Sequence, residues 1–230
     1  MLGVSRSRLY EGVDVDVRAL EPLLRRREAR EPLAYVLGEW GFRGLTLKTD
    51  RRGLVPRPET ETLVERALDL VRDVAAPRVL DVGVGGGAIA LAIKAEQPQA
   101  HVTGVDTSAE ALELARENAR ALGLDVELRD AGFEAAAEGW DLVVANPPYI
   151  PQGALTSLQP ELHWEPRDAL VGNGFHEEIA RIADTRAIAF EVGDGQAHAV
   201  AATLAELGYH AITVTRDLGG TERVVEGRRG

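Results

Sequence analysis

The sequence predicts an α/β protein with a seven-stranded, mostly parallel sheet that carries helices on both faces. From residue 78 onward, short apolar runs alternate with longer segments of helical apolar spacing, which is the pattern of a parallel sheet with crossover helices. The first run ends in a glycine-rich turn that leads into a helix, as at a ligand-binding strand end. The 230 residues are 45% hydrophobic, enough for one domain-sized core and a small appendage.

The first 71 residues contain two expected helices and a region of short strands. A helix is expected over residues 17–30, from the apolar positions Val17, Leu20, Leu23 and Leu24. Pro22 is expected in its first turn, because proline disrupts a helix interior. Residues 33–57 predict short strands and turns, with strands at 33–38 and 44–48. Residues 59–71 predict a helix with one apolar face, made of Leu63, Val64, Ala67, Leu68 and Val71.

The alternation that follows supplies the sheet. The expected strands cover residues 78–82, 101–105, 125–129, 140–145, 187–192, 209–215 and 221–226. The expected helices cover residues 88–96, 108–122 and 196–207. In such a fold the ligands bind at the carboxyl ends of the strands. Polar residues that follow a strand are therefore the first candidates for a site.

The charge distribution argues against tight binding to nucleic acid. Residues 1–60 hold 12 basic against 9 acidic side chains, whereas residues 61–230 hold 14 against 28. A body with this excess of negative charge repels a phosphate backbone, so we expect no stable nucleic-acid binding. Arg25, Arg26 and Arg27 form a basic cluster, which fits either a solvated helix face or a surface for a protein partner.

Composition also sets the expected compartment. The chain has no cysteine, which leaves no disulfides or zinc knuckles, and we expect no metal site. No stretch approaches ~20 uninterrupted apolar residues, and residues 1–9 lack the apolar core of a signal peptide. We therefore expect a cytoplasmic monomer that does not bind a membrane.

The glycine-rich stretch after residues 78–82 predicts a nucleotide-cofactor loop. Gly83, Gly85 and Gly87 alternate with other residues, and glycines allow a positive φ and a close approach of ligand to backbone. A loose turn is the plain alternative. Asp106 ends the next strand about twenty residues later, where a carboxylate accepts hydrogen bonds from both ribose hydroxyls. Its alternative role, N-cap of the next helix, suits Ser108 instead, so the loop and Asp106 together predict a nucleoside site.

S-adenosylmethionine fits this site better than a dinucleotide does. A dinucleotide loop usually has the spacing G-x-G-x-x-G, whereas the third glycine here follows after one residue rather than two. Asp81 precedes the loop, and a carboxylate there suits a cofactor whose amino-acid end carries an ammonium group close to a sulfonium. We expect S-adenosylmethionine as the cofactor.

The stretch Asn146-Pro147-Pro148-Tyr149 predicts what the methyl group is transferred to. A turn that ends a strand explains the prolines but not Asn146 and Tyr149. An amide or aromatic amine nitrogen is a poor nucleophile because its lone pair is delocalised. The Asn146 carbonyl and a backbone carbonyl would accept its two N–H groups and stabilise the positive charge that develops on it. The prolines fix that backbone, and Tyr149 offers a π-face to a planar group.

In these motifs the sequence resembles the peptide chain release factor N5-glutamine methyltransferase family, from about residue 29 to its end. The Asn-Pro-Pro-Tyr stretch is shared with nucleic-acid amino-methyltransferases, so the neighbouring stretches carry the specificity. They are Arg30–Trp40 (REPLAYVLGEW), Val55–Glu61 (VPRPETE), Asp81–Leu91 (DVGVGGGAIAL), Glu165-Pro166 with Ala169-Leu170, and Glu191–Gln196 (EVGDGQ). The resemblance implies a Rossmann-like class I methyltransferase. Its activity would be methyl transfer from S-adenosylmethionine to the glutamine of the Gly-Gly-Gln motif of bacterial release factors.

The resemblance also implies roles for individual residues. On the cofactor side are Asp81, Gly83, Val84, Gly85, Gly86, Gly87, Asp106, Asp130, Ala131 and Asn146. On the substrate side are Asn146, Pro147, Pro148 and Tyr149, with Arg57, Pro58 and Glu59 at the rim, and Asn146, Pro147 and Tyr149 are the expected catalytic residues. The rim stretch also fits a plain helix start. Glu165 fits a structural hydrogen bond or a substrate contact.

The resemblance further implies two regions. We expect residues 1–50 to form a short helical and hairpin region that docks the substrate, and residues 51–230 to form the methyltransferase domain. The family's N-terminal region is longer than this one. Gly86 stands where the family usually has Ser or Thr, and Ala131-Gly132 stand where it often has a bulky residue beside the adenine.

Two other functions remain open from the sequence. One is methyl transfer to N6 of adenine or to another amino group of nucleic acid, which the acidic body and the lack of a target-recognition domain disfavour. The other is a non-catalytic module that binds a cofactor or a partner, which the presence of both Asn146 and Asp106 disfavours.

Overall fold

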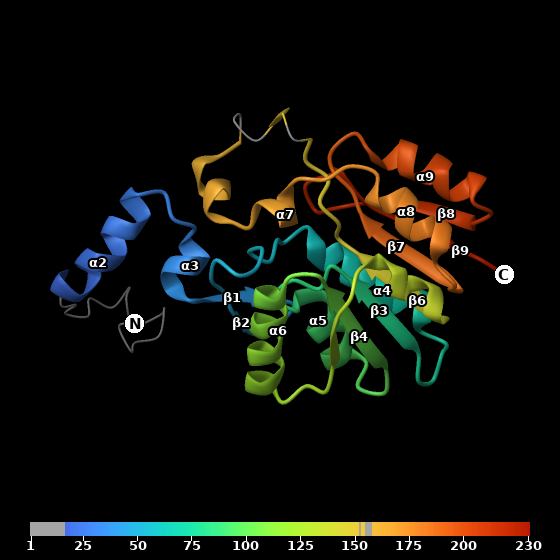
Figure 1. Cartoon of the computed structure of the whole chain (residues 1–230), viewed down its shortest axis with the longest axis horizontal. Coiled ribbons are helices and arrows are strands. Elements are labelled where there is room, and N and C mark those ends of the chain that lie inside the picture. The colour runs from blue at the N-terminus through green and yellow to red at the C-terminus, as the bar shows by residue number, and fades with distance from the viewer. Residues whose placement is uncertain (1–16, 152, 155–157) are drawn as a thin grey trace.

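A seven-stranded sheet forms the centre of the computed structural model, which describes residues 17–151, 153–154 and 158–230 (Figure 1). The strands are β3 (Arg78–Val82), β4 (His101–Asp106), β5 (Glu127–Asp130), β6 (Leu142–Ala145), β7 (Ala187–Glu191), β8 (His210–Arg216) and β9 (Glu222–Arg228). Their order across the sheet is β5-β4-β3-β6-β7-β9-β8. The predicted seven-stranded sheet is confirmed. The stretch searched for a signal peptide, residues 1–9, lies outside the described residues.

The direction of the strands fixes where a site can form. The strands β5, β4, β3, β6 and β7 run parallel, so their carboxyl ends meet at one edge of the sheet. Strand β9 pairs antiparallel with β7, and β8 pairs antiparallel with β9. The chain builds outward from β3 to β4 and β5, then returns to add β6 on the other side of β3. Such a reversal point is where open α/β sheets bind ligands.

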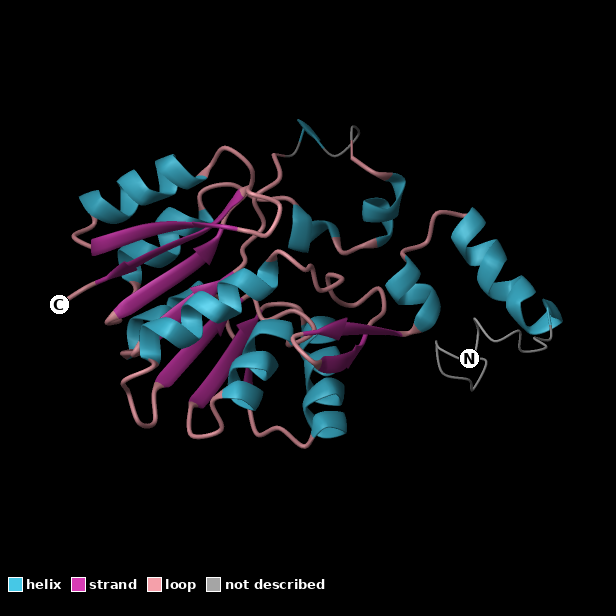
Figure 2. Ribbon diagram, turned by 180° about the vertical axis from the view of Figure 1, so that it is seen from behind, coloured by secondary structure: helices cyan, strands magenta, loops and turns pink. Residues whose placement is uncertain are grey.

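Helices cover both faces of the sheet (Figure 2). They are α4 (Thr60–Val71), α5 (Ala88–Glu96), α6 (Ala109–Leu122), α8 (Phe175–Ile182) and α9 (Ala197–Glu206), with the short elements η1 (Phe133–Glu138), η3 (Pro160–Trp164) and α7 (Arg167–Leu170). Leu63, Ile93 and Leu112 belong to one buried apolar layer, and Ile179 and Leu204 to the other. Strands β6 and β7 are buried along their whole length, as central parallel strands covered on both faces should be.

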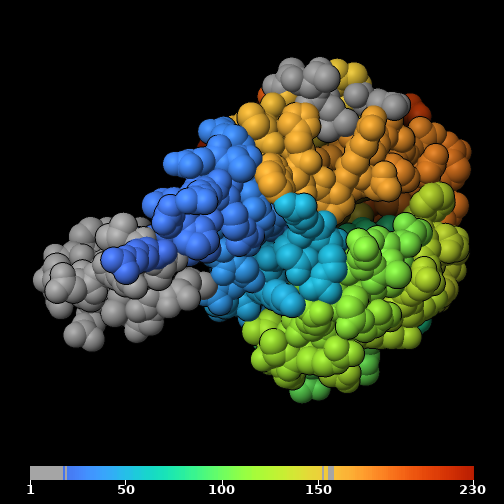
Figure 3. All heavy atoms as spheres, turned by 60° about the vertical axis from the view of Figure 1, so that its left-hand side comes forward, coloured from blue at the N-terminus to red at the C-terminus, as the bar shows by residue number. Residues whose placement is uncertain are grey.

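The N-terminal part projects from one side of this body (Figure 3). It contains α2 (Val17–Glu28), α3 (Leu33–Leu37) and a hairpin of β1 (Glu39–Phe42) and β2 (Leu45–Lys48). Phe42 and Leu47 of the hairpin reach the core of the body. Leu24 of α2 is 55% exposed, so the expected apolar face of this helix is not fully covered. In the part of the chain that the structure describes, no helix is long and apolar enough to cross a membrane.

Two predictions for the N-terminal part are wrong. Residues 33–38, expected as a strand, form α3, which begins after Pro32 and ends at Gly38. Gly38 has a left-handed conformation, and its N–H donates to the Ala34 carbonyl at 2.8 Å. A short apolar run fits either element, and here the proline before it and the glycine after it favour a helical turn. Pro22, expected in a first turn, lies inside α2, at an exposed position where water reaches the backbone.

Candidate active site

The glycine loop follows β3 at the reversal point of the sheet. Gly83, Gly85 and Gly87 have φ angles of 75°, 53° and 90°. Residues that carry a Cβ rarely adopt such positive φ angles. The backbone N–H groups of Gly83 and Val84 both donate to the Val105 carbonyl at 2.9 Å, which fixes the loop against β4. The loop therefore has the conformation that the spacing of its glycines predicts.

Asp106 ends β4 directly beside this loop. Its Oδ2 accepts the N–H of Gly85 at 2.9 Å, and its Oδ1 accepts the N–H of Ser108 at 2.8 Å. Ser108 is the N-cap of α6, and its hydroxyl accepts from the backbone of Ala111 as expected. A carboxylate has about four lone-pair positions, so Asp106 retains acceptors for two ribose hydroxyls. The loop and this carboxylate fit the nucleoside end of S-adenosylmethionine.

Asp130 and Ala131 extend the same edge of the sheet. Asp130 is the register partner of Asp106 at the end of β5, and it is exposed. The N–H of Ala131 donates to the Asp106 carbonyl at 3.3 Å. These residues lie beside Asp106 at neighbouring strand ends, where the family resemblance implies the base of the cofactor.

Asp81 lies beneath the glycine loop. It is fully buried, its Oδ2 accepts the N–H of Ala90 at 3.0 Å, and its Oδ1 has no hydrogen-bond partner among the described residues. Burial raises the pKa of this carboxyl to about 7, the Ala90 hydrogen bond lowers it, and the nearby charge of Asp106 adds to the rise. Asp81 therefore binds the first turn of α5, the helix that follows the loop, and its other oxygen has no partner among the described residues.

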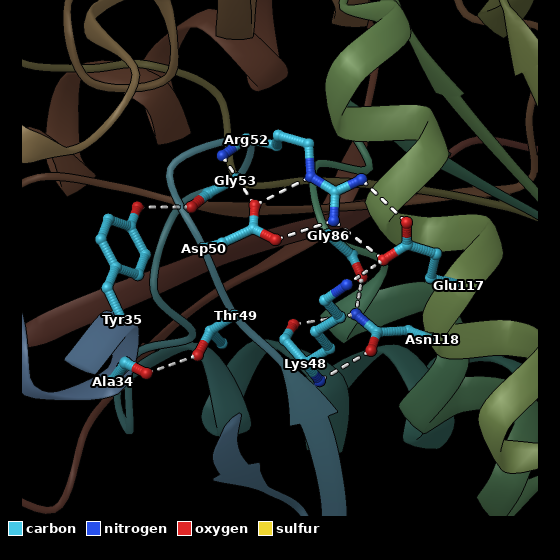
Figure 4. Close-up of polar contacts among 10 residues, drawn as sticks. All are labelled: Ala34, Tyr35, Lys48, Thr49, Asp50, Arg52, Gly53, Gly86, Glu117 and Asn118. Carbon is cyan, nitrogen blue, oxygen red and sulfur yellow. Dashed lines mark hydrogen bonds and ion pairs between the residues drawn. The ribbon is translucent and has the colours of Figure 1, made fainter. Parts of the chain in front are cut away.

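Hydrogen bonds tie the hairpin and the segment after it to the glycine loop (Figure 4). Asn118 of α6 is buried, and its Nδ2 donates to the carbonyls of Gly86 at 2.9 Å and Lys48 at 3.2 Å. Its Oδ1 accepts the N–H of Lys48 at 2.7 Å. A Cβ on Gly53 would lie 3.2 Å from the nitrogen of Gly86, so the segment after β2 lies directly on the loop. Gly86 takes part in this close approach at the position where the family usually has a hydroxyl residue.

Two clefts meet at Asn146, which follows β6. The larger cleft has a volume of about 690 Å³ and is lined by Pro147, Pro148 and Tyr149 among others. The smaller cleft lies between the glycine loop and the segment after β2, and its lining includes Gly83, Val84, Gly85 and Gly86. Asn146 lines both clefts. A group bound at Asn146 from the larger cleft is therefore adjacent to the cofactor side.

The Asn146 side chain has Thr60 and Glu191 as neighbours, and the sequence alone predicted no role for either residue. Its Nδ2 donates to the hydroxyl of Thr60 at 3.4 Å. Glu191, the last residue of β7, is buried and lines the larger cleft, and its Oε1 accepts the hydroxyl of Tyr149 at 3.5 Å. Burial beside Glu191 raises the pKa of Tyr149 to about 12. The sequence did contain one indication of a role for Glu191. This residue follows an apolar run and is the first residue of the stretch Glu191–Gln196, which resembles the family.

The expected rim residues Arg57, Pro58 and Glu59 do not all line a cleft. Arg57 and Glu59 line the larger cleft, whereas Pro58 is exposed and lines neither cleft. Glu165 is buried, accepts the N–H of Val55 at 2.9 Å and forms an ion pair with Arg57. Glu165 therefore makes a structural hydrogen bond, one of the two expected roles, and also lines the cleft.

Arginines of the N-terminal part connect it to the far side of the larger cleft. Arg27 and Arg30 both reach the carboxylate of Glu161 in η3, at 3.3 and 2.9 Å. Arg26 pairs with Glu31 and donates to the carbonyls of Tyr35 and Val36. Part of the basic cluster thus holds the N-terminal part together and braces it against η3.

Comparison with known proteins agrees with this site. The model of the methyltransferase small domain family matches residues 60–175. A release factor glutamine methyltransferase of Deinococcus radiodurans is 42% identical over 228 residues, which cover 95% of this chain and 81% of that protein. One of Bordetella pertussis is 42% identical, covering 91% of this chain and 82% of that protein.

Solved structures share the fold at low sequence identity. The hMettl16 catalytic domain in complex with a MAT2A 3′UTR hairpin has a TM-score of 0.65 and 13% identity, covering 85% of this chain and 81% of that one. A methyltransferase from Pyrococcus furiosus has a TM-score of 0.57 and 17% identity, covering 94% and 100%. The fold is that of class I methyltransferases, as the sequence predicted. At the identity and coverage of its curated relatives, this chain belongs to the release factor glutamine methyltransferase family and is an S-adenosylmethionine-dependent methyltransferase.

Proposed function

We propose that this enzyme methylates the side-chain amide nitrogen of the glutamine in the Gly-Gly-Gln motif of bacterial peptide chain release factors, and so tunes translation termination in the cytoplasm. The observation that carries the proposal is the position of Asn146, which lines both the glycine-loop cleft and the larger, open cleft. An amide nitrogen that enters the open cleft meets the cofactor side at this residue. The family name of the relatives supports a release-factor glutamine as the substrate.

The residues of the site suit a weakly nucleophilic nitrogen. S-adenosylmethionine supplies an electrophilic methyl group on its sulfonium when bound. The Asn146 side-chain oxygen and the Pro147 carbonyl accept the two N–H groups of the substrate amide and stabilise the positive charge that develops on its nitrogen. The proline pair keeps this backbone rigid, and the ring of Tyr149 packs against the planar amide.

The cofactor side of the proposal uses the strand ends of the first half of the sheet. Gly83, Val84, Gly85, Gly86 and Gly87 would hold the methionine part of the cofactor through backbone groups. The carboxylate of Asp106 would hold the ribose, with Asp130 and Ala131 near the base and Asp81 fixing the start of α5 after the loop.

The charge of the larger cleft favours a protein over a nucleic acid as substrate. Its lining contains Arg27, Arg57 and Arg223, and also Glu59, Glu161, Glu165 and Glu191. A polyanion binds best to a surface where positive charge prevails, whereas carboxylates outnumber arginines here. The nucleic-acid amino-methyltransferase alternative is therefore less well supported.

A parallel labelling assay tests the proposal. Tritiated S-adenosylmethionine is offered with a purified bacterial release factor, duplex DNA and ribosomal RNA in separate reactions. We expect label only in the release factor, on the glutamine of its Gly-Gly-Gln motif as mapped by mass spectrometry. A release factor with alanine at that glutamine is the matched control and should remain unlabelled. Label in either nucleic acid but not in the protein would reject the proposal.

Asn146→Ala tests the mechanism. We expect kcat to fall by about 10²–10³-fold, because one preorganised group that stabilises transition-state charge is lost. Cofactor affinity, measured by calorimetric titration, should be unchanged. Asn146→Asp keeps an acceptor and should retain modest activity, and Gln99→Ala, which changes an exposed amide just before β4 at the amino ends of the strands, serves as the control. Full activity of Asn146→Ala would reduce Asn146 to a turn residue.

A further inference from the structure

Glu191 stands beside Asn146 at the carboxyl edge of the sheet. Ala145 of β6 and Phe190 of β7 are register partners, and Asn146 and Glu191 are the residues that follow them on these two parallel strands. The side chain of Glu191 is 1% exposed, yet the residue lines the larger cleft. Its Oε1 accepts the hydroxyl of Tyr149, and its Oε2 has no hydrogen-bond partner among the described residues.

A buried carboxylate that forms no ion pair with a basic side chain of the described residues has no evident structural purpose. Glu226 on the neighbouring strand β9 is equally buried, but both its oxygens are paired with the guanidinium of Arg66, at 2.7 and 2.8 Å. Burying a carboxylate without such a partner destabilises the folded chain, because the charge loses its hydration. The position of Glu191 in the cleft suggests that the group acts on the site instead.

Hydrogen-bond donors of the site converge on Glu191. Burial raises the pKa of Glu191 to about 7, and the nearby donors of the Thr60 hydroxyl and the Asn146 amide lower this pKa. The same Asn146 Nδ2 lies 3.4 Å from the Thr60 oxygen. The side-chain amide nitrogen of Asn146 is thus directed at Thr60, and it also lowers the pKa of Glu191 at the neighbouring strand end. The oxygen of this amide is then left for the cleft.

We propose that Glu191 is a positioning residue that holds the amide nitrogen of Asn146, directly and through Thr60, so that the amide oxygen faces the substrate. An asparagine side chain has a donor end and an acceptor end of nearly the same shape, and packing alone does not distinguish them. A carboxylate only accepts hydrogen bonds, so it selects the donor end. The inference rests on the proposed function, because only an N–H-bearing substrate needs the oxygen of Asn146.

A double-mutant cycle tests whether Glu191 acts through Asn146. Glu191→Gln keeps the shape but adds a donor, so the Asn146 amide loses its preferred orientation. We expect kcat to fall by about 10–100-fold in the wild-type background, and by less than about twofold when residue 146 is already alanine. An equal fold-loss in both backgrounds would show that Glu191 only supports the structure. Full activity of the single variant would also overturn the proposal.

Two further variants distinguish an effect on catalysis from a general effect on folding. Glu226→Gln removes a buried carboxylate of the same sheet and should leave kcat unchanged. Thr60→Val removes the bridging hydroxyl while keeping the size of the side chain, and should show the same coupling to Asn146→Ala as Glu191→Gln does. If Thr60→Val and Asn146→Ala act additively, the route through Thr60 is wrong.

A measurement without turnover gives an independent readout. The side-chain amide signal of Asn146 in a ¹H–¹⁵N spectrum is identified by its loss in Asn146→Ala. In the cofactor-free wild type it should shift with pH around neutrality, as Glu191 changes from carboxyl to carboxylate among its charged neighbours Glu59, Arg57 and Arg223. His176, which contacts the Glu191 carbonyl at 2.8 Å, has a lowered pKa and titrates at more acidic pH.

In Glu191→Gln the Asn146 signal should no longer shift in this range. A signal that shifts identically in both proteins contradicts the inference. Failure of the proposed function looks different, because the wild-type enzyme would then leave the release factor unlabelled whatever the spectrum shows.

Discussion

We propose that Asp106 serves both the glycine loop and the bound cofactor. Its two oxygens fix the N–H groups of Gly85 and Ser108, so the carboxylate orients the glycine loop and the start of α6 together. The lone pairs that remain on the Asp106 carboxylate can accept hydrogen bonds from the hydroxyls of a ribose. Under this proposal, we expect replacement of Asp106 to remove contacts to the cofactor and to loosen the glycine loop.

We predict that Asp106→Ala weakens S-adenosylmethionine binding by about 1–3 kcal/mol, since charge-assisted hydrogen bonds to the ribose are lost. Calorimetric titration measures this as a rise in Kd of roughly 5–150-fold. Asp125→Ala, an exposed acid at the opposite end of β5, is the matched control and should bind normally. An unchanged Kd for Asp106→Ala removes this residue from the cofactor site.

At the residue scale, the sequence predicted best where function depends on local spacing. The positive φ angles of Gly83, Gly85 and Gly87 and the location of Asn146 after a buried strand all agree with it. Glu191 was missed as a functional group because its importance comes from the pairing of β6 with β7, across more than forty residues of chain. No local pattern reports which strand ends become neighbours.

At the element scale, the elements of the alternating strand and helix pattern were predicted well, whereas a short apolar run outside that pattern was not. The helix at 88–96 and the strand at 78–82 have their predicted bounds. Residues 33–37 instead form a helical turn, since five apolar residues carry too little periodicity to separate the two structures. Tyr35 in this turn donates its hydroxyl to the Gly53 carbonyl at 2.7 Å, a long-range contact that no propensity encodes.

The helix α2 is the element whose role is most open to test. Its contacts to the body run through Arg27 to Glu161 and, just beyond the helix, through Arg30 to the same carboxylate. None of its described side chains is buried, so it contributes little to the core. It lies next to the larger cleft, which Arg27 lines. We propose on this basis that residues 1–50 dock the release factor.

Deletion of residues 1–28 should therefore raise the KM for the release factor by about tenfold or more, which corresponds to about 1.4 kcal/mol of lost binding. Cofactor affinity should stay the same, because the glycine loop and Asp106 lie outside the deleted part. Steady-state kinetics and calorimetric titration measure the two quantities. Glu161→Ala removes only the brace between η3 and the arginines, and serves as the comparison. Loss of folding or of cofactor binding in the truncated protein would make the segment structural.

At the scale of the whole molecule, the sheet buries Asp81 and Glu191 near its carboxyl edge, and neither forms an ion pair with a basic side chain of the described residues. Asp81 lies in the buried part of β3, and Glu191 is the last residue of β7. Burial raises the pKa of each to about 7. Acids at the surface behave in the opposite way, as where Arg52 lowers the pKa of Asp50. The pH dependence of stability therefore has two separate parts.

The last prediction concerns that pH dependence. A carboxyl whose pKa is higher in the folded than in the unfolded chain binds more protons when folded. Its contribution to stability is complete below the unfolded pKa, about 4, and is lost as pH rises through the folded pKa, about 7. The free energy of unfolding should therefore fall between about pH 5 and about pH 8 in the cofactor-free enzyme. Stability that comes from acids with lowered pKa is lost only at lower pH, outside this window.

Chemical denaturation across this range gives the measurement, and glutamine and asparagine variants assign it. Asp81→Asn and Glu191→Gln should each flatten the fall, gaining about 1–3 kcal/mol relative to wild type as pH rises, since one unit of pKa shift corresponds to about 1.4 kcal/mol. Glu110→Gln, which changes an exposed acid of α6, should follow the wild-type curve. If the two buried variants also ran parallel to wild type, these carboxyls would be ionised in the folded chain throughout, held by water or neighbouring dipoles within the site.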